Sequence, residues 1–147
     1  MILLDTNVIS ELMRPTPDAY VQAWIDDKDL PELATTSVNL AEIGYGIALL
    51  PEGRRKDAMQ NAAENVFARL FSGSVLPFDA PAAGLYSGIA AAHRHAGRSV
   101  GILDLQIAAI AKADGATLAT RNTRHFTDCG IELIDPFTPI PGPTAAQ

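Results

Sequence analysis

Short apolar runs alternate along this chain with longer segments whose apolar positions recur every three or four residues. The first of these runs is Met1-Ile2-Leu3-Leu4. Short apolar runs are typical of buried strands, whereas the longer periodicity predicts amphipathic helices. We expect strands over five segments of the chain, namely Met1–Leu4, Leu33–Thr35, Val75–Leu76, Thr117–Thr120 and Glu132–Ile134.

Helices fill the intervals between these strands, and Gly97 and Gly115 are typical helix stop signals. Strands that alternate with helices pair in parallel and carry helices on both faces of their sheet. The predicted fold class is therefore α/β, with a central, mostly parallel sheet of about five strands. The expected helices are a short one after Asp5, one over about Pro17–Asp27, a pair joined at Pro51–Gly53 over about Ser37–Ser72, and two more over about Ala80–Ala96 and Leu103–Asp114.

Length and composition indicate one domain. The chain has 147 residues, of which 48% are hydrophobic, and this supplies enough apolar surface for a single core. We place the domain at residues 1–137. The prolines at positions 139, 141 and 143 disfavour regular structure, so we expect residues 138–147 to form a flexible, proline-rich tail.

The cysteine content and the N-terminus bear on the cellular location. Cys129 is the only cysteine, so an internal disulfide is excluded and nothing indicates an oxidising compartment. The sequence enters its first predicted strand without a basic region or a long apolar stretch. We therefore expect no signal peptide, no membrane span and a cytoplasmic location.

Four polar residues stand where a segment meets apolar sequence that should be buried: Asp5, Glu42, Asp104 and Asn122. Asp5 follows the first predicted strand, and ligands of α/β sheets bind at the carboxyl ends of the strands. Several buried carboxylates repel one another unless a cation offsets their charge. The hard ions Mg²⁺ and Mn²⁺ take oxygen ligands of this kind. The pattern therefore predicts a metal site.

Each of these residues also has a purely structural interpretation. Asp5 and Asn122 can cap a helix or a turn. A first-turn Asp such as Asp104 is favoured by the helix dipole whatever its function. Glu42 fits a structural role less well, because Val38 and Tyr45 share its face of the predicted helix, where a solvated Glu would have polar neighbours.

The order and spacing of the four residues resemble those of the PIN-domain ribonucleases. Within that family the chain is most similar to the toxins of the bacterial VapBC and FitAB toxin–antitoxin pairs. The resemblance is closest at Leu4–Glu11, which reads LDTNVISE, and at Ala119–Phe126, which reads ATRNTRHF. Asn122 departs from the pattern, since many members carry a fourth acid there. An amide oxygen can still coordinate a cation, but it brings no charge.

The resemblance implies a metal-dependent ribonuclease that acts as the toxin of a type II toxin–antitoxin system. In such an enzyme Asp5, Glu42 and Asp104 would hold one or two Mg²⁺ or Mn²⁺ ions, and Asn122 would assist them. The reaction would be metal-assisted hydrolysis of a phosphodiester bond, which needs no nucleophilic side chain.

The resemblance also bears on two threonine hydroxyls beside the acids, on the substrate and on the protein partners. Thr6 and Thr120 stand beside the metal carboxylates and would orient a carboxylate or the attacking water. Unpaired RNA is the expected substrate, because RNA recognition favours single strands, and the preference over DNA rests on the resemblance. A cognate antitoxin is the implied partner, and we also expect a homodimer. An antitoxin tail carrying Arg or Lys would fit the carboxylate pocket.

The net charge of −6 disfavours binding of the chain to nucleic acid. The positions of the basic residues therefore matter more than the total charge. Arg121 and Arg124 flank the proposed metal position and are the expected contacts to RNA phosphates. The run Arg54-Arg55-Lys56 is interpreted as the solvated start of a helix, as most charge runs are.

Two functions of other classes stay open. A phosphatase of the haloacid dehalogenase type also places an Asp after its first strand, but it needs a second Asp two positions later, where this chain has Asn7. A non-catalytic module, in which Asn122 reflects lost metal binding, would act only as the partner of a repressor. The three histidines, His93, His95 and His125, lack the spacing of a zinc site, so we expect surface or packing roles for them.

Overall fold

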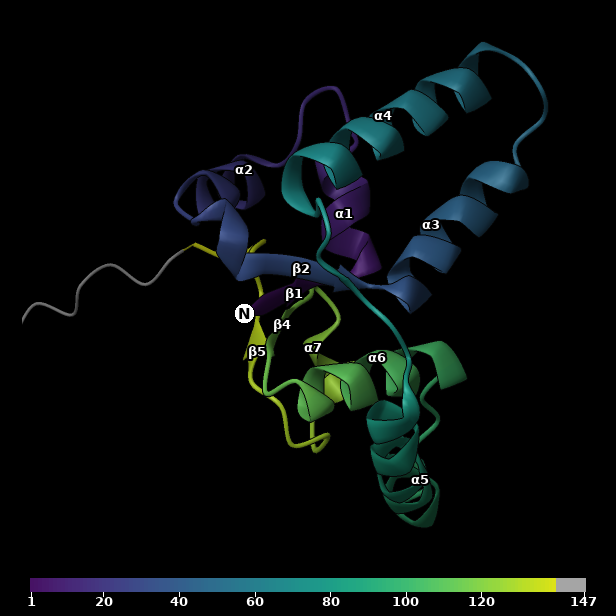
Figure 1. Cartoon of the computed structure of the whole chain (residues 1–147), viewed down its shortest axis with the longest axis vertical. Helices are drawn as coiled ribbons and strands as arrows, with labels where there is room; N and C mark the ends of the chain where they lie inside the picture. The colour runs from purple at the N-terminus through teal and green to yellow at the C-terminus, as the bar shows by residue number, and fades with distance from the viewer. Residues whose placement is uncertain (140–147) are drawn as a thin grey trace, which may run out of the picture.

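A parallel β-sheet runs through the middle of the molecule, with helices on both of its faces (Figure 1). The structure is a computed structural model that describes residues 1–139. Within this range the sheet has five strands in the order β3-β2-β1-β4-β5, and every neighbouring pair is parallel. The strands are β1 (Ile2–Leu4), β2 (Leu33–Thr36), β3 (Val75–Leu76), β4 (Thr117–Ala119) and β5 (Leu133–Ile134).

Seven α-helices connect the strands in the described part of the chain. Gly97 and Gly115 follow two of them with φ of 70° and 61°, a left-handed conformation that glycine adopts without strain and that ends a helix. The helices are α1 (Thr6–Leu12), α2 (Ala19–Asp26), α3 (Ser37–Ala48), α4 (Arg54–Leu70), α5 (Ala80–His95), α6 (Ile102–Ala113) and α7 (Thr123–Phe126), and a 3₁₀ turn covers Leu30–Glu32.

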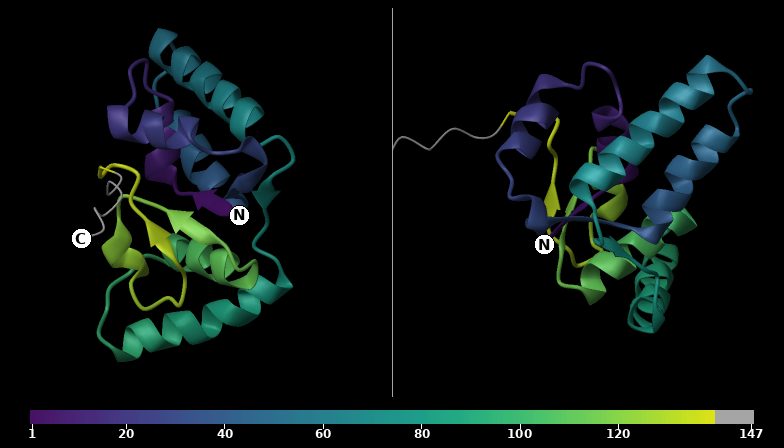
Figure 2. Two further views of the ribbon diagram at one scale, coloured as in Figure 1. Left: turned by 90° about the vertical axis from the view of Figure 1, so that its left-hand side faces the viewer. Right: turned by 45° about the horizontal axis from the view of Figure 1, so that its top comes forward.

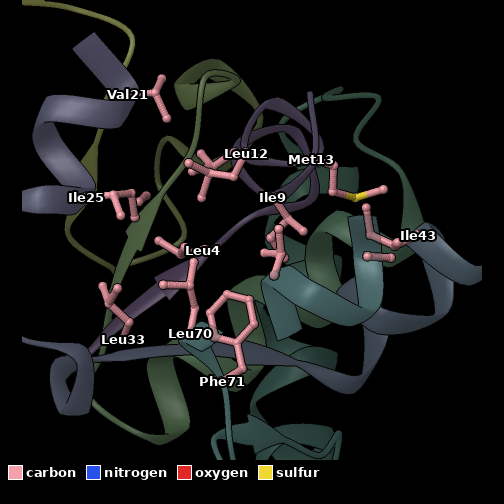
Figure 3. Close-up of a cluster of buried hydrophobic side chains, with 14 of the residues drawn as sticks. Leu4, Ile9, Leu12, Met13, Val21, Ile25, Leu33, Ile43, Leu70 and Phe71 are labelled. Carbon is pink, nitrogen blue, oxygen red and sulfur yellow. The ribbon is translucent and has the colours of Figure 1, made fainter. Parts of the chain in front are cut away.

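Alternation of side chains along the strands builds two cores, one on each face of the sheet. Leu3 pairs in register with Leu118, and both belong to the core beneath α5 and α6. Leu4 and Ala119 point to the opposite face, where the core includes residues of α1, α2, α3 and α4. Figure 3 shows this second core, with Phe71 and its aliphatic neighbours packed over β1. Figure 2 shows the sheet between these two helical layers.

The sequence-based prediction of an α/β fold with a five-stranded parallel sheet is confirmed, and the strand and helix bounds agree to within a few residues. Helix α7 was not predicted, because its four residues are too few to show a period. Most of the predicted flexible tail over residues 138–147 lies outside the described residues. Between residues 1 and 139, no helix is long and apolar enough to span a bilayer.

The parallel topology places the polar residues of interest at one edge of the sheet. β1 ends at Leu4, immediately before Asp5, and β4 ends at Ala119, immediately before Thr120. β2 ends at Thr36, whose hydroxyl caps α3. Because β1 lies between β2 and β4, these three carboxyl ends are adjacent in space.

Candidate metal centre at the carboxyl edge of the sheet

Asp5 is the most enclosed acid of this edge, with 4% of its surface exposed. Its Oδ1 accepts hydrogen bonds from the backbone N–H of Thr6 at 2.8 Å and from Nδ2 of Asn39 at 3.0 Å. Its Oδ2 accepts from Oγ1 of Thr120 at 2.7 Å and from Nδ2 of Asn7 at 3.2 Å. The bond from Thr6 also caps helix α1, so the structural interpretation of Asp5 holds together with its place in the acidic site. Four donors thus fix the orientation of one carboxylate.

Asn39 links helix α3 to the acidic site through a hydrogen bond to Asp5. Its side chain is fully buried one turn into the helix, where the hydroxyl of Thr36 donates to its Oδ1 at 2.6 Å. That bond turns the Asn39 amide nitrogen toward Asp5 and toward Oγ1 of Thr6, which it reaches at 3.0 Å. The N-cap of α3 therefore orients a hydrogen-bond donor toward the carboxylate at the end of β1.

Glu42 lies three residues beyond Asn39, on the same face of α3. Its side chain is half-buried, and its Oε1 accepts a hydrogen bond of 3.0 Å from Oγ1 of Thr6. Thr6 thereby lies between Glu42 and Asp5 and contacts both, through its hydroxyl and its backbone N–H respectively.

Asp104 reaches the same region from the first turn of α6 and is also half-buried. Its Oδ2 lies 2.8 Å from Nδ1 of His125, which extends from α7. Oε2 of Glu42 and Oδ1 of Asp104 accept no hydrogen bond from residues 1–139. Each of these two acids therefore keeps one oxygen for a ligand.

The three carboxylates influence one another electrostatically. Burial raises the pKa of Asp5 above its ordinary value, and the charge of Asp104 raises it further, against the lowering effect of its hydrogen-bond donors. Burial likewise raises the pKa of Glu42, and the charges of Asp5 and Asp104 add to the shift. The structure therefore brings together the three acids that the sequence predicted, close enough for their charges to repel one another.

Comparison with known proteins agrees with this geometry. The PIN domain family matches residues 2–130 of the chain. The chain belongs to the PIN-domain family. The PIN domain described here is 40% identical over 139 residues to the VapC ribonuclease Y4jK of Sinorhizobium fredii, which covers 95% of this chain and 99% of that protein. It is 39% identical over 137 residues to the toxin FitB of Neisseria gonorrhoeae, which covers 93% and 99% of the two chains.

Solved structures resemble the PIN domain equally well. The structure of FitAB bound to an IR36 DNA fragment superposes with a TM-score of 0.86 at 38% identity, over 95% of this chain and 98% of that chain. A crystal structure of VapBC2 from Rickettsia felis, bound to a promoter DNA fragment, has a TM-score of 0.75 at 27% identity. A third neighbour, VapBC-5 from Mycobacterium tuberculosis, is described as a member of the VapBC family of toxin-antitoxin systems and has a TM-score of 0.67 at 26% identity, over 90% of this chain and 95% of that chain.

The candidate metal-ligand atoms of this PIN domain fit a hard divalent cation. All of them are oxygens of carboxylates, hydroxyls or amides, which Mg²⁺ and Mn²⁺ prefer to the nitrogen and sulfur ligands of zinc. Across residues 1–139, no three side chains among His, Cys, Asp and Glu form a ready-made metal cage. Such a cage is not required, because Mg²⁺ keeps several waters and takes one or two protein carboxylates with phosphate oxygens. At Asp5 a cation would compete with the longest of the four hydrogen bonds, that from Asn7.

Asn122, the fourth residue predicted for the site, stands at the N-terminus of α7 with its side chain exposed. Its backbone N–H donates to Oγ1 of Thr120 at 3.0 Å, which places it at the same sheet edge. Its side chain makes no capping hydrogen bond to α7. Asn122 therefore occupies the N-cap position of α7, as its structural interpretation expected, but its side chain makes no capping bond there, and within residues 1–139 its side-chain amide group has no hydrogen-bond partner.

The two arginines expected to contact RNA have different surroundings. The guanidinium of Arg121 stacks over the ring of Phe137 at 4.5 Å, and its backbone N–H donates to Oδ1 of Asn7. Arg124 is exposed on α7. The basic run that begins at Arg54 opens helix α4 and is largely exposed, as predicted for a solvated helix end.

Three residues of the site were not predicted from the sequence: Asn7, Asn39 and His125. The expectation of a packing role fits His93, which is buried and bonds the carbonyl of Ile89. It is incomplete for His125, which contacts Asp104. One signal was present in the sequence, because Asn39 shares the buried helix face of Glu42 at a spacing of three residues.

Proposed function

We propose that this protein is a Mg²⁺- or Mn²⁺-dependent endoribonuclease and the toxin of a type II toxin–antitoxin pair. The observation that carries the proposal is the convergence of Asp5, Glu42 and Asp104 at one sheet edge, with raised pKa values at the first two. The names of the VapC and FitB relatives, at about 40% identity over nearly the whole chain, support the same function.

Each residue of the site has a separate proposed role in hydrolysis. A divalent ion, when bound, supplies Lewis acidity and neutralises charge on the scissile phosphate. Asp5 offers a carboxylate that four hydrogen bonds hold in one orientation, which limits the reorganisation needed when substrate enters. Glu42 and Asp104 contribute the oxygens that no other group occupies. Thr6 and Thr120 orient Glu42 and Asp5, respectively, by donating to them.

RNA is the proposed substrate, and it approaches as a single strand. The acids lie at the edge of a sheet between α1, α3 and α6, where an unpaired strand reaches them more easily than the stacked backbone of a duplex. The proposed site of action is the cytoplasm, where both RNA and an antitoxin are available.

The proposed antitoxin has an apolar groove to occupy on the helix that carries Glu42. An apolar hollow of about 170 Å³ lies between α3 and α4 and is lined by Leu40, Ile43, Gly44, Ile47, Gln60, Ala63, Glu64 and Phe67. The hollow and the acidic site share helix α3, which carries Leu40 and Ile43 as well as Glu42. An antitoxin segment that buries apolar side chains in this hollow can place an Arg or Lys on the carboxylates, which would offset their repulsion.

We also propose that the protein forms a homodimer. Ile102 and Leu103, at the start of α6, are 65% and 47% exposed, and large apolar side chains at this level of exposure favour contact with a second copy. Sedimentation equilibrium of the wild type and of Ile102→Ser tests this contact, since the variant should shift the equilibrium toward monomer.

Cleavage of a labelled single-stranded RNA, in Mg²⁺ and in chelator, tests the proposed activity. The wild type should cut only in metal, and Asp5→Asn should remove the activity while circular dichroism shows an intact fold. Full activity in correctly folded Asp5→Asn protein would contradict the assignment of Asp5.

The alternative is an inactive PIN module that only binds a repressor. This alternative is favoured by Asn122, which brings no charge to the fourth position of the site. Calorimetric titration with Mg²⁺ separates the two functions, because an inactive module of this kind should take up no metal and leave RNA intact.

A further inference from the structure

A basic hollow of about 390 Å³ lies beside the metal centre, between the segment that precedes α6 and helix α7. Its lining residues are Arg98, Ser99, Val100, Arg124, His125 and Thr127. Two guanidinium groups and an imidazole thus gather at one place in a chain whose net charge is −6. We call this site the basic hollow.

The basic hollow is continuous with the acidic centre through one residue. His125 lines the hollow, and its Nδ1 contacts Oδ2 of Asp104 at 2.8 Å. A nucleic acid strand with its scissile phosphate at Asp104 therefore has its neighbouring phosphates within reach of the hollow. An acidic protein segment has no comparable reason to continue from a cluster of carboxylates, which would repel it.

The two arginines of the basic hollow are held differently. Arg98 donates to the carbonyl of Thr127 at 3.2 Å and pairs with Asp128 at 2.7 Å, which fixes its guanidinium at the rim. Arg124 makes no ion pair with any residue between 1 and 139. A paired and an unpaired guanidinium side by side suit a polyanion, because guanidinium groups bind phosphate through parallel N–H donors.

We propose that the basic hollow binds the backbone phosphates next to the scissile bond of the RNA substrate. Arg98 and Arg124 supply the charge, and the hydroxyl of Ser99 supplies a neutral donor. This proposal rests on the ribonuclease function proposed above, since it assigns a subsite to the same substrate.

Binding of a fluorescent single-stranded RNA in chelator, followed by anisotropy at several salt concentrations, tests the subsite apart from catalysis. Arg98→Gln and Arg124→Gln should each weaken binding about fourfold near physiological salt and lower the slope of log K against log [salt] by about 0.7, the value for one phosphate contact to a single strand. Arg14→Gln is the matched control, because Arg14 is an exposed arginine paired with Glu11 on α1, and it should change neither quantity.

A second variant gives an effect of opposite sign. Asp128→Asn removes the counter-ion of Arg98 and keeps the shape of the side chain. Position 128 has φ of 67°, a left-handed conformation that Asn tolerates as well as Asp does. RNA should bind more tightly to this variant. If the pair between Arg98 and Asp128 is only structural, Asp128→Asn will lower stability without any gain in RNA affinity.

Each outcome decides between the two proposals. If the wild type cleaves RNA while both arginine variants bind it as the wild type does, with the same salt slope, the basic hollow is not a phosphate subsite and the ribonuclease function stands. If the variants lose antitoxin binding but keep RNA binding, the hollow serves the protein partner and the proposal is wrong. If the wild type neither binds nor cleaves RNA, the ribonuclease function fails, and the subsite fails with it.

Discussion

Oγ1 of Thr120 donates a hydrogen bond of 2.7 Å to Oδ2 of Asp5, across 115 residues of sequence. The same hydroxyl accepts hydrogen bonds from Nδ2 of Asn7 and from the backbone N–H of Asn122. Thr120 is fully buried, so water does not replace these partners. One hydroxyl therefore joins the ends of β1 and β4 and links the most buried acid to the residue at the fourth position.

Replacing that hydroxyl should affect both stability and activity. Thr120→Val keeps the shape of the side chain but leaves buried donors and a carboxylate oxygen without their partner, which costs about 1–3 kcal/mol of unfolding free energy. RNA cleavage should fall as well, because Asp5 loses the shortest of its four hydrogen bonds. Chemical denaturation and single-turnover cleavage measure the two effects.

Thr35→Val is the matched control for this variant. Thr35 is equally buried, and its hydroxyl donates at 2.9 Å to the carbonyl of Leu4 rather than to an acid. It should lose a comparable amount of stability and keep its cleavage rate per folded molecule. Equal losses of rate in the two variants would show that Thr120 has only a structural role.

The raised pKa of Glu42 predicts how stability depends on pH without metal. Below the ordinary pKa of 4.5 the carboxyl is protonated in both the folded and the unfolded chain. As pH rises above that value, the unfolded chain ionises first, so Glu42 makes a growing unfavourable contribution to folding until pH passes its raised folded-state pKa. Glu42→Gln should therefore gain stability over the wild type as pH rises from about 4.5 to neutral.

Denaturation of both proteins in chelator across this pH range measures the effect, because contributions of the other titrating groups largely cancel in the difference. In millimolar Mg²⁺ the wild type should be more stable than Glu42→Gln, since the ion binds the charged wild-type site and stabilises the folded protein by mass action. A difference that does not change with pH would contradict the electrostatic coupling of Glu42 to Asp5 and Asp104.

The sequence predicted the sheet and the three acids for a physical reason. Asp5 directly follows an apolar strand, and the position of such a residue at a strand's carboxyl end depends only on local sequence and parallel topology. The hydrophobic periodicity of the surrounding segments likewise set the helix bounds to within a few residues.

The neutral residues of the site could not be found in the same way. Asn7 and His125 act through contacts to Asp5 and Asp104, and His125 lies 21 residues from Asp104 in sequence. A neutral amide or imidazole creates no energetic conflict that would mark it before the fold is known, whereas buried carboxylates do. Arg124 was predicted as a phosphate contact, but its place in the basic hollow was not, because Arg98 and Arg124 come together only in three dimensions.

The apolar groove between α3 and α4 predicts a way to separate toxin activity from neutralisation. A Cβ atom added at Gly44 meets no atom within 4 Å, and Gly44 lines the groove, so we expect Gly44→Gln to fold and to place its side chain in the groove. Helix α3 should gain slightly in stability, since Gln is a better helix former than Gly. Binding of the antitoxin should weaken by at least tenfold, and RNA cleavage should persist.

Gly88→Gln on α5 is the control, because a Cβ atom added there also meets no atom within 4 Å and Gly88 does not line the groove. Calorimetry with the purified antitoxin and a cleavage assay on each variant give the two readouts. Antitoxin affinity that is unchanged in Gly44→Gln would mean that the groove is not its binding site.

Asn122→Asp tests the departure from the family pattern at the fourth position. The substitution adds an anionic oxygen at nearly constant shape, so Mg²⁺ should bind more tightly and half-maximal activity should occur at a lower Mg²⁺ concentration. Without metal the variant should be less stable than the wild type, because a further negative charge joins Asp5, Glu42 and Asp104. A capping effect does not complicate the comparison, since the side chain of Asn122 makes no capping hydrogen bond and Asp caps about as well as Asn.

Activity against Mg²⁺ concentration and melting temperature in chelator are measured for both proteins. Superimposable activity curves with equal melting temperatures would remove Asn122 from the metal site and leave a centre of three carboxylates.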